Sequence, residues 1–178
     1  MALRQLYIAQ SLDGYIADEA GGVEWLESRG QGGDFGYDAF LRQVGAIAMG
    51  AATYEQIVGW DIDWPYPGKP TWVSTHRELA KPEGADVRFT DRPAADVVAE
   101  IERETDGNIW LVGGADLARQ WVDERVLDEL ILFVVPLLLG GGVRLFGDTR
   151  ETDLELTEVR SYPNGFVELR YRLPREPA

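Results

Sequence analysis

The spacing of apolar residues among polar ones changes repeatedly along the chain. Short runs that are apolar almost throughout predict buried strands over residues 3–11, 46–49, 71–75, 86–89, 109–112 and 130–135. Between them, apolar residues and capping signals at helical spacing predict helices over residues 34–44, 53–58, 94–105 and 115–126. Strands that alternate with helices predict an α/β domain with a mainly parallel central sheet flanked by helices.

The last part of the chain follows a different pattern. Residues 154–162 and 166–173 alternate between apolar and polar positions, and Pro163-Asn164-Gly165 joins them. This predicts a C-terminal antiparallel hairpin. No change of composition marks a second domain and no internal repeat is present, so we expect a single domain over residues 1–178.

A glycine-rich segment separates the first predicted strand from the first predicted helix. Residues 13–33 contain six glycines, with Trp25 and Leu26 between them. That composition predicts a long, mobile loop, and loops of this length are uncommon unless they have a function. Asp34 follows the loop and is expected to be the N-cap of the helix, whose first turn Gly36 weakens.

Composition excludes several classes of function. The chain has no cysteine and one histidine, His76, so thiolate catalysis, iron–sulfur clusters and a zinc site are excluded and no metal is expected. A net charge of -14 argues against nucleic acid as a partner. No apolar run approaches the ~18 residues of a membrane span, and the N-terminus lacks the layout of a signal peptide. We therefore expect a cytoplasmic protein without a membrane partner.

The most informative motif is the predicted strand of residues 109–112 followed directly by Gly113-Gly114 and a helix. Such a turn presents free backbone N–H groups at a helix N-terminus, where the helix dipole favours a phosphate or pyrophosphate. The alternative is a plain strand-to-helix turn. Asp116 in the first helical turn suits the dipole but would repel a phosphate placed beside its side chain.

Two other predicted strands end on polar groups. Gly50 and Thr53 follow one strand, and Ser74, Thr75, His76 and Arg77 follow the next. Thr53 is either a helix N-cap or a hydroxyl donor to a ligand, and the second group is either a ligand site or a solvated turn. Because ligands of open parallel sheets bind beyond the carboxyl ends of the strands, these groups together would suit a nucleotide.

Five motifs, SLDGYIA, MGAATYE, VST, VGGADL and VPLLLGGGVRLF, occur here in the order and spacing of the dihydrofolate reductase-like family. The chain resembles most the reductase domain of the bifunctional riboflavin-biosynthesis deaminase-reductase and its stand-alone relatives, from residue 3 to residue 173. The resemblance implies a dihydrofolate reductase-like fold and an NADPH cofactor along the carboxyl edge of the sheet. The residues implied to bind it are Ala9, Ile16, Gly50, Ala51, Thr53, Ser74, Thr75, Arg77, Val112, Gly113, Gly114, Ala115, Asp116 and Leu117.

The chain departs from the family at one cofactor position. Ala51 stands where the family usually has an arginine that faces the 2′-phosphate of NADPH. NADH is therefore a possible cofactor, unless Arg77 or, less well, His76 supplies the missing cation.

Three residues are candidates for catalysis by resemblance. Asp34 matches the carboxylate that faces the substrate in dihydrofolate reductases, with Asp38 as the alternative; its other explanation is the N-cap role. Trp25 resembles the tryptophan of the mobile active-site loop, or is an apolar anchor of that loop. Asp13 either faces the substrate or forms an Asp-Gly turn.

The predicted function is an NAD(P)H-dependent oxidoreductase that transfers a hydride to a small heteroaromatic substrate, pterin-like or pyrimidine-like. The alternative is a nucleotide-binding module of the same fold without catalysis, which Ala51 and the uncertain proton donor suggest. The expected partners are a small-molecule substrate and, by resemblance, a second copy of the chain in a homodimer.

Overall fold

A computed structural model of the chain describes residues 2–30 and 33–174. Its strands are β1 (Arg4–Ser11), β2 (Tyr15–Ala17), β3 (Val44–Gly50), β4 (Thr71–Ser74), β5 (Val87–Thr90), β6 (Asn108–Gly113), β7 (Glu129–Val135), β8 (Val143–Arg144), β9 (Glu155–Ser161) and β10 (Val167–Arg172). Its helices are α1 (Glu24–Glu27), α2 (Tyr37–Leu41), α3 (Ala51–Gly59), α4 (Ala94–Glu104) and α5 (Ala115–Asp123). Among these residues no helix is long and apolar enough to cross a membrane.

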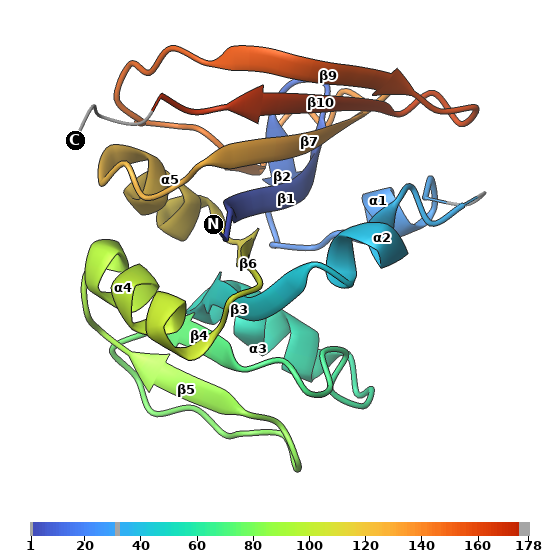
Figure 1. The fold of residues 1–178 in the computed structure, drawn as a ribbon. Helices are drawn as coiled ribbons and strands as arrows, with labels where there is room; N and C mark the ends of the chain where they lie inside the picture. Colours follow the sequence, from blue (N-terminus) through green and yellow to red (C-terminus); the bar gives the residue numbers. More distant parts are fainter. Residues whose placement is uncertain (1, 31–32, 175–178) are drawn as a thin grey trace.

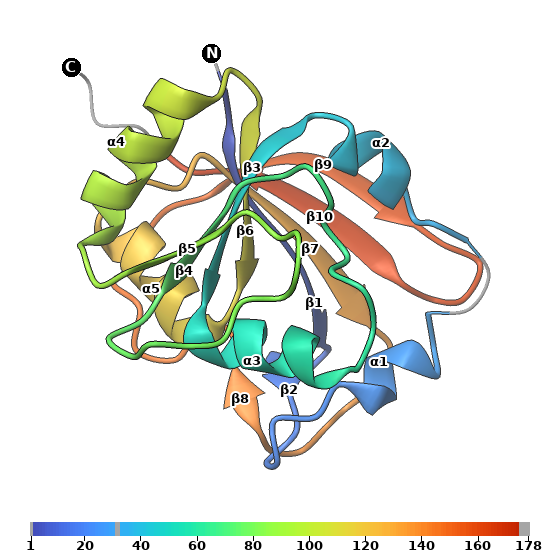
Figure 2. The ribbon, with the colours of Figure 1, turned by 90° about the horizontal axis from the view of Figure 1, so that it is seen from below.

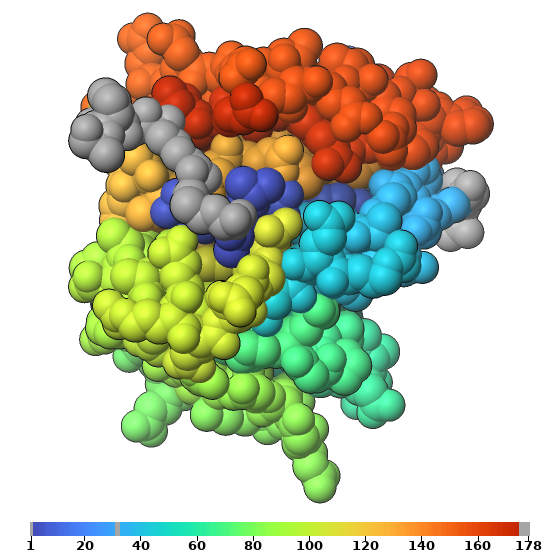
Figure 3. Space-filling model, viewed as in Figure 1, coloured from blue at the N-terminus to red at the C-terminus, as the bar shows by residue number. Residues whose placement is uncertain are grey.

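An eight-stranded sheet in the order β5-β4-β3-β6-β1-β7-β10-β9 forms the centre of the molecule (Figure 1). The pairs from β5 to β7 are parallel, whereas β10 is antiparallel to both β7 and β9. The prediction of a mainly parallel sheet that ends in an antiparallel hairpin is confirmed. The first strand of the chain lies in the middle of the sheet, and in the space-filling view only a narrow blue region of it shows between its neighbours (Figure 3).

The central strands β3, β6 and β7 are buried on both faces, which explains why they are apolar almost throughout. Along β6, Ile109 and Leu111 belong to one apolar cluster, and Trp110 between them belongs to the other. The first cluster contains the inner faces of α4 and α5, and the second contains those of α2 and α3. Figures 1 and 2 both place α4 and α5 side by side, with α2 on the opposite side of the molecule.

The structure corrects the prediction of one long loop over residues 13–33. The described part of this segment contains β2, which pairs with β8 in a small second sheet, and the short helix α1. The partner strand β8 lies far away in the sequence, so the local pattern gave no sign of this pairing.

Two predicted helix starts are also wrong. Helix α2 begins at Tyr37 with Gly36 as its N-cap, because Gly36 has the left-handed φ of 79° that ends the preceding turn. Asp34 therefore precedes the N-cap position, although its carboxylate still accepts the N–H of Asp38 in the first turn of α2. Val44 begins β3. Helix α3 begins at Ala51 with Gly50 as its N-cap, so Thr53 lies in the first turn and is not the cap.

Candidate functional site

A cavity of about 1530 Å³ opens at the carboxyl ends of the parallel strands. Its walls come from β1, from the ends of β3, β4 and β6, from the starts of α3 and α5, and from the glycine-rich segment. Every residue predicted for the site lines this cavity except Asp13 and Trp25. The structure thus brings together residues from positions 9 to 117 of the chain, as expected for a ligand site at this edge of an α/β sheet.

The N-termini of α3 and α5 meet on the floor of the cavity. Their N-caps, Gly50 and Gly114, have extended backbones and no side-chain caps. A Cβ atom placed on Gly50 would lie 3.5 Å from the Gly114 nitrogen, so the two turns are in contact. Gly113 has a φ of +139° that favours glycine, and the Gly113-Gly114 peptide bond is cis. Two helix N-termini without side-chain caps form a site that favours an anion.

Thr53 lies beside both glycines. A Cβ atom placed on Gly114 would lie 3.4 Å from the Thr53 hydroxyl, and one placed on Gly113 would lie 3.7 Å from it. Within the described chain this hydroxyl makes no hydrogen bond. Because the cap position belongs to Gly50, the Thr53 hydroxyl is available to a ligand.

At the end of β4 the cavity has a polar wall that contains Ser74, Thr75, His76 and Arg77. The Arg77 guanidinium forms two hydrogen bonds with the Glu55 carboxylate of α3, at 3.0 Å and 2.6 Å. The sequence analysis did not single out Glu55, although it is the last residue of the MGAATYE motif. The cation expected to replace the missing arginine is therefore already paired with an acid.

The opposite part of the cavity is aromatic. Ring centroids are 4.9 Å apart for Tyr7 and Phe133, 5.8 Å for Tyr37 and Trp110, and 5.4 Å for Tyr66 and Trp110. Burial raises the pKa of Tyr7 and of Tyr66, so both phenols are neutral donors at physiological pH. We call this region the aromatic half; its lining residues are Tyr7, Phe35, Tyr37, Tyr66, Trp110, Phe133 and Phe166. The sequence suggested only Tyr66, from the aromatic loop with Trp60 and Trp64, as a residue that shapes either the substrate mouth or a subunit contact. The other residues come from distant parts of the chain, so sequence analysis did not group them.

Asp34 lies at the rim beside the aromatic half. One of its carboxylate oxygens accepts the Gly36 N–H at 3.1 Å, and the other accepts the Asp38 N–H at 3.3 Å. Asp34 thus both stabilises the turn before α2 and faces the cavity. Asp38, the alternative proton donor, is exposed and does not line the cavity.

The structure places Asp13 and Trp25 outside the cavity wall. The Asp13 carboxylate accepts hydrogen bonds from the Ser11 hydroxyl at 2.6 Å and from the N–H groups of Leu139 and Gly140 at 3.0 Å and 2.8 Å. These bonds, the Ser11 bond first, lower the pKa of Asp13 to about 2. Asp13 therefore ties the turn after β1 to the loop after β7, which leaves a substrate-facing role without support.

Trp25 lies in α1, and its indole nitrogen is buried without a hydrogen-bond partner among the described residues. The neighbouring Val23 and Leu26 reach the cavity instead. The segment that carries them is held by Gln56, whose amide donates to the Gly21 carbonyl at 3.1 Å, and by Asn164, whose amide donates to the Arg29 carbonyl at 3.1 Å. The glycine-rich segment therefore borders the cavity as a wall fixed to two other elements.

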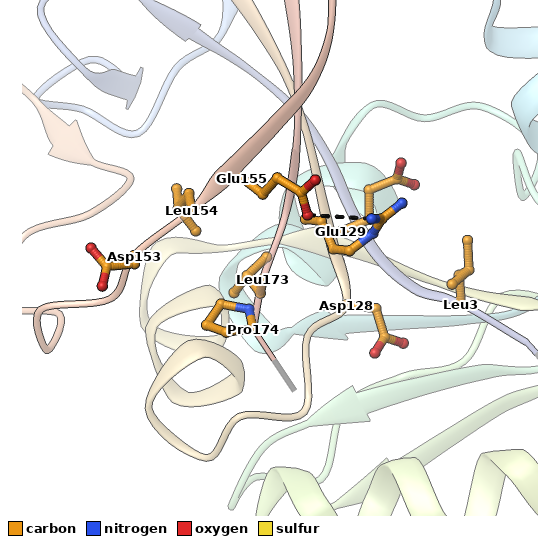
Figure 4. A pocket seen from close by; sticks show the side chains of 9 residues that line it. Leu3, Asp128, Glu129, Asp153, Leu154, Glu155, Leu173 and Pro174 are labelled. Carbon is orange, nitrogen blue, oxygen red and sulfur yellow. Dashed lines mark hydrogen bonds and ion pairs between the residues drawn. The ribbon is translucent and has the colours of Figure 1, made fainter. Parts of the chain in front are cut away.

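A second cavity of about 650 Å³ lies near the amino ends of β1 and β7 (Figure 4). Two of its acidic lining residues bind arginines: Arg172 donates to Glu155 at 3.3 Å, and Arg4, which is not among the lining residues, donates twice to Asp128, at 2.8 Å and 2.7 Å. None of the predicted site residues lies there. We assign it no functional role.

Comparison with known proteins identifies the family. The model of the RibD C-terminal domain matches residues 64–167, more than half of the chain. The uncharacterized protein YwjB of Bacillus subtilis (strain 168) is 36% identical over 167 residues, which cover 93% of this chain and 95% of YwjB. The chain therefore belongs to the RibD C-terminal domain family.

Solved structures share the fold. A putative riboflavin biosynthesis protein from Shewanella sp. PV-4 superposes with a TM-score of 0.87 at 29% identity, covering 98% of this chain and all of that one. The dihydrofolate reductase of Enterococcus faecalis, solved with NADP(H), superposes with a TM-score of 0.67 at 15% identity, covering 97% of each chain. The fold is thus dihydrofolate reductase-like.

Proposed function

We propose that the protein is an NAD(P)H-dependent reductase that transfers a hydride to a small heteroaromatic substrate. One observation carries the proposal: a single cavity joins an anion site made by two helix N-termini to a wall of aromatic rings. A dinucleotide needs the first part for its diphosphate, and a planar acceptor ring suits the second.

The residues present fit such a cofactor. The N–H groups at the starts of α3 and α5 and the Thr53 hydroxyl would hold the diphosphate. Ala9 and Ile16 would flank the nicotinamide, and Ser74 and Thr75 would lie beside the adenosine ribose. The bound cofactor supplies the hydride, while the chain positions the two rings and excludes water. Asp34 is the proposed carboxylate through which a proton reaches the substrate.

NADPH is the proposed cofactor, and Arg77 is the residue proposed to meet its 2′-phosphate. To do so, the Arg77 guanidinium must leave or share its pair with Glu55. Both side chains are about half exposed, at 57% and 44%, so the pair is weak and can rearrange. NADH has no 2′-phosphate and requires no such rearrangement, so a comparison of the affinities for NADPH and NADH tests the proposed role of Arg77.

The alternative is a binding module without reductase activity. Two observations favour it: Ala51 replaces the usual arginine, and the Asp34 carboxylate is already occupied by two backbone N–H groups. Binding of a coenzyme is expected in both cases, so only turnover separates them.

Calorimetric titration with NADPH and NADH tests whether the protein binds a coenzyme. Oxidation of the bound coenzyme in the presence of pterin, pyrimidine and nitroaromatic acceptors then tests whether the protein transfers a hydride. We expect binding of at least one coenzyme and oxidation with at least one acceptor. Binding without any oxidation favours the module, and no heat with either coenzyme at millimolar concentration overturns both proposals.

We also propose a homodimer. The edge strand β9 carries two exposed apolar side chains, Leu156 at 51% and Val159 at 57%, and Leu138 in the loop after β7 is 70% exposed. An edge strand with apolar outward residues tends to associate with another chain. Sedimentation of the wild type and of the Val159→Lys variant tests this: we expect a dimer that dissociates in the variant, and a monomeric wild type contradicts the proposal.

A further inference from the structure

Three tyrosine hydroxyls of the aromatic half have no hydrogen-bond partner among the described residues. Tyr7, Tyr37 and Tyr66 line the cavity, and their hydroxyls make no hydrogen bond within residues 2–30 and 33–174. Tyr66 is 8% exposed as a whole residue, but none of the three hydroxyl oxygens is fully buried, so each can be reached from the cavity. A hydroxyl on a cavity wall that has no protein partner can donate a hydrogen bond to a bound ligand. Three such donors around one wall point to a ligand with matching acceptors.

The distribution of charged residues around the cavity disfavours an anionic ligand in the aromatic half. Among the described lining residues the basic side chains are His76 and Arg77, both at the end of β4, where Arg77 is bound to Glu55. The acid nearest to the aromatic half in sequence is Asp34, which precedes the lining residues Phe35 and Tyr37. A phosphate or carboxylate placed among these rings would lose its hydration and would meet no cation among the described residues that line this half.

We propose that the aromatic half binds an uncharged planar ring compound that carries no phosphate or carboxylate, and that Tyr7, Tyr37 and Tyr66 recognise its ring acceptors through their hydroxyls. The flat aromatic rings provide contact area for a planar ligand. The neutral phenol hydroxyls orient the ligand through hydrogen bonds and do not favour an anion. This deepens the proposed function, because it names the class of substrate that the same cavity takes.

A pair of fluorescent probes tests the charge requirement. Pterin and pterin-6-carboxylate share one ring system and differ by a single carboxylate. Each is titrated into the full chain at neutral pH, with and without saturating NADP⁺. We expect pterin to bind at least about ten times more tightly, since an unpaired carboxylate costs more than one factor of ten in affinity. Equal or tighter binding of the carboxylate, or binding of neither probe, overturns the proposal.

Variants test the hydroxyls. Tyr66→Phe, Tyr7→Phe and Tyr37→Phe each keep the ring and remove one donor, so we expect pterin to bind about two to ten times more weakly in each. The control is Tyr171→Phe, because Tyr171 lies outside the cavity and its hydroxyl also has no partner in the part of the chain that the structure describes. Unchanged pterin affinity in all three cavity variants overturns the role of the hydroxyls.

The coenzyme titration separates this inference from the proposed function. A protein that binds pterin selectively but neither coenzyme refutes the reductase while the substrate class stands. A protein that binds a coenzyme but prefers the carboxylated probe refutes the substrate class alone. Retained thermal stability in the tyrosine variants shows that any lost pterin affinity arises from the missing hydroxyl.

Discussion

The replacement of Thr53 by valine tests the position of the proposed diphosphate. The Thr53 hydroxyl has no partner in the described chain, and Gly50 rather than Thr53 caps α3. The variant Thr53→Val should therefore change the free energy of unfolding of the unliganded protein by less than about 0.5 kcal/mol. A hydrogen bond to a charged acceptor contributes about 1.5–3 kcal/mol. Its loss should weaken coenzyme binding about 10- to 150-fold.

Calorimetry with NADPH and NADH measures the affinity, and thermal unfolding without ligand measures the stability. The matched control is Thr53→Ser, which keeps the hydroxyl and should bind within about threefold of the wild type. The N–H groups of Ala51, Ala52 and Thr53 remain in both variants, so binding is weakened and not abolished. Affinity in Thr53→Val within twofold of the wild type would refute the placement of the diphosphate beside this residue.

Three further changes have defined outcomes. Glu55→Gln frees Arg77, so calorimetry should show up to about fivefold tighter NADPH binding and unchanged NADH binding; equal effects on both coenzymes contradict this. Asp13→Asn should lower the melting temperature at neutral pH. Because the pKa of Asp13 is about 2 when folded against an ordinary 3.8, the stabilisation is complete above about pH 4 and is lost toward pH 2, so wild type and variant should converge there. Gln56→Ala removes the bond to the Gly21 carbonyl, and amide exchange in residues 18–30 should accelerate about fivefold; unchanged exchange shows that the segment is held elsewhere.

The parts of the fold that sequence analysis predicted correctly depend on local patterns. The strand predicted over residues 109–112 is β6 (Asn108–Gly113), because a segment buried on both faces is apolar throughout. The hairpin around Pro163-Asn164-Gly165 was predicted because turn residues and alternation coincide. Gly50, Gly113 and Gly114 indicated the two strand-to-helix turns on the floor of the cavity, since a glycine between a predicted strand and a predicted helix is visible in the sequence.

The features that were missed depend on contacts between distant residues. Tyr15 of β2 pairs with Arg144 of β8, and nothing near either residue indicates this. Tyr7 and Phe133 meet because β1 and β7 are neighbours in the sheet, although the chain between them is most of the domain. Helix α2 begins later than predicted because the backbone of Gly36 adopts a left-handed conformation, which a glycine permits but does not require.

The place of β1 in the sheet has a consequence for how the protein is made. The ribosome synthesises β1 before the other strands of the sheet, and its partners β6 and β7 begin only at residues Asn108 and Glu129. Until they emerge, the apolar nascent chain around Leu6 has no sheet to join and is exposed to chaperones and to aggregation. Phe166, which completes the cavity, emerges later still. The wall of the cavity is therefore assembled only after Phe166 has been synthesised.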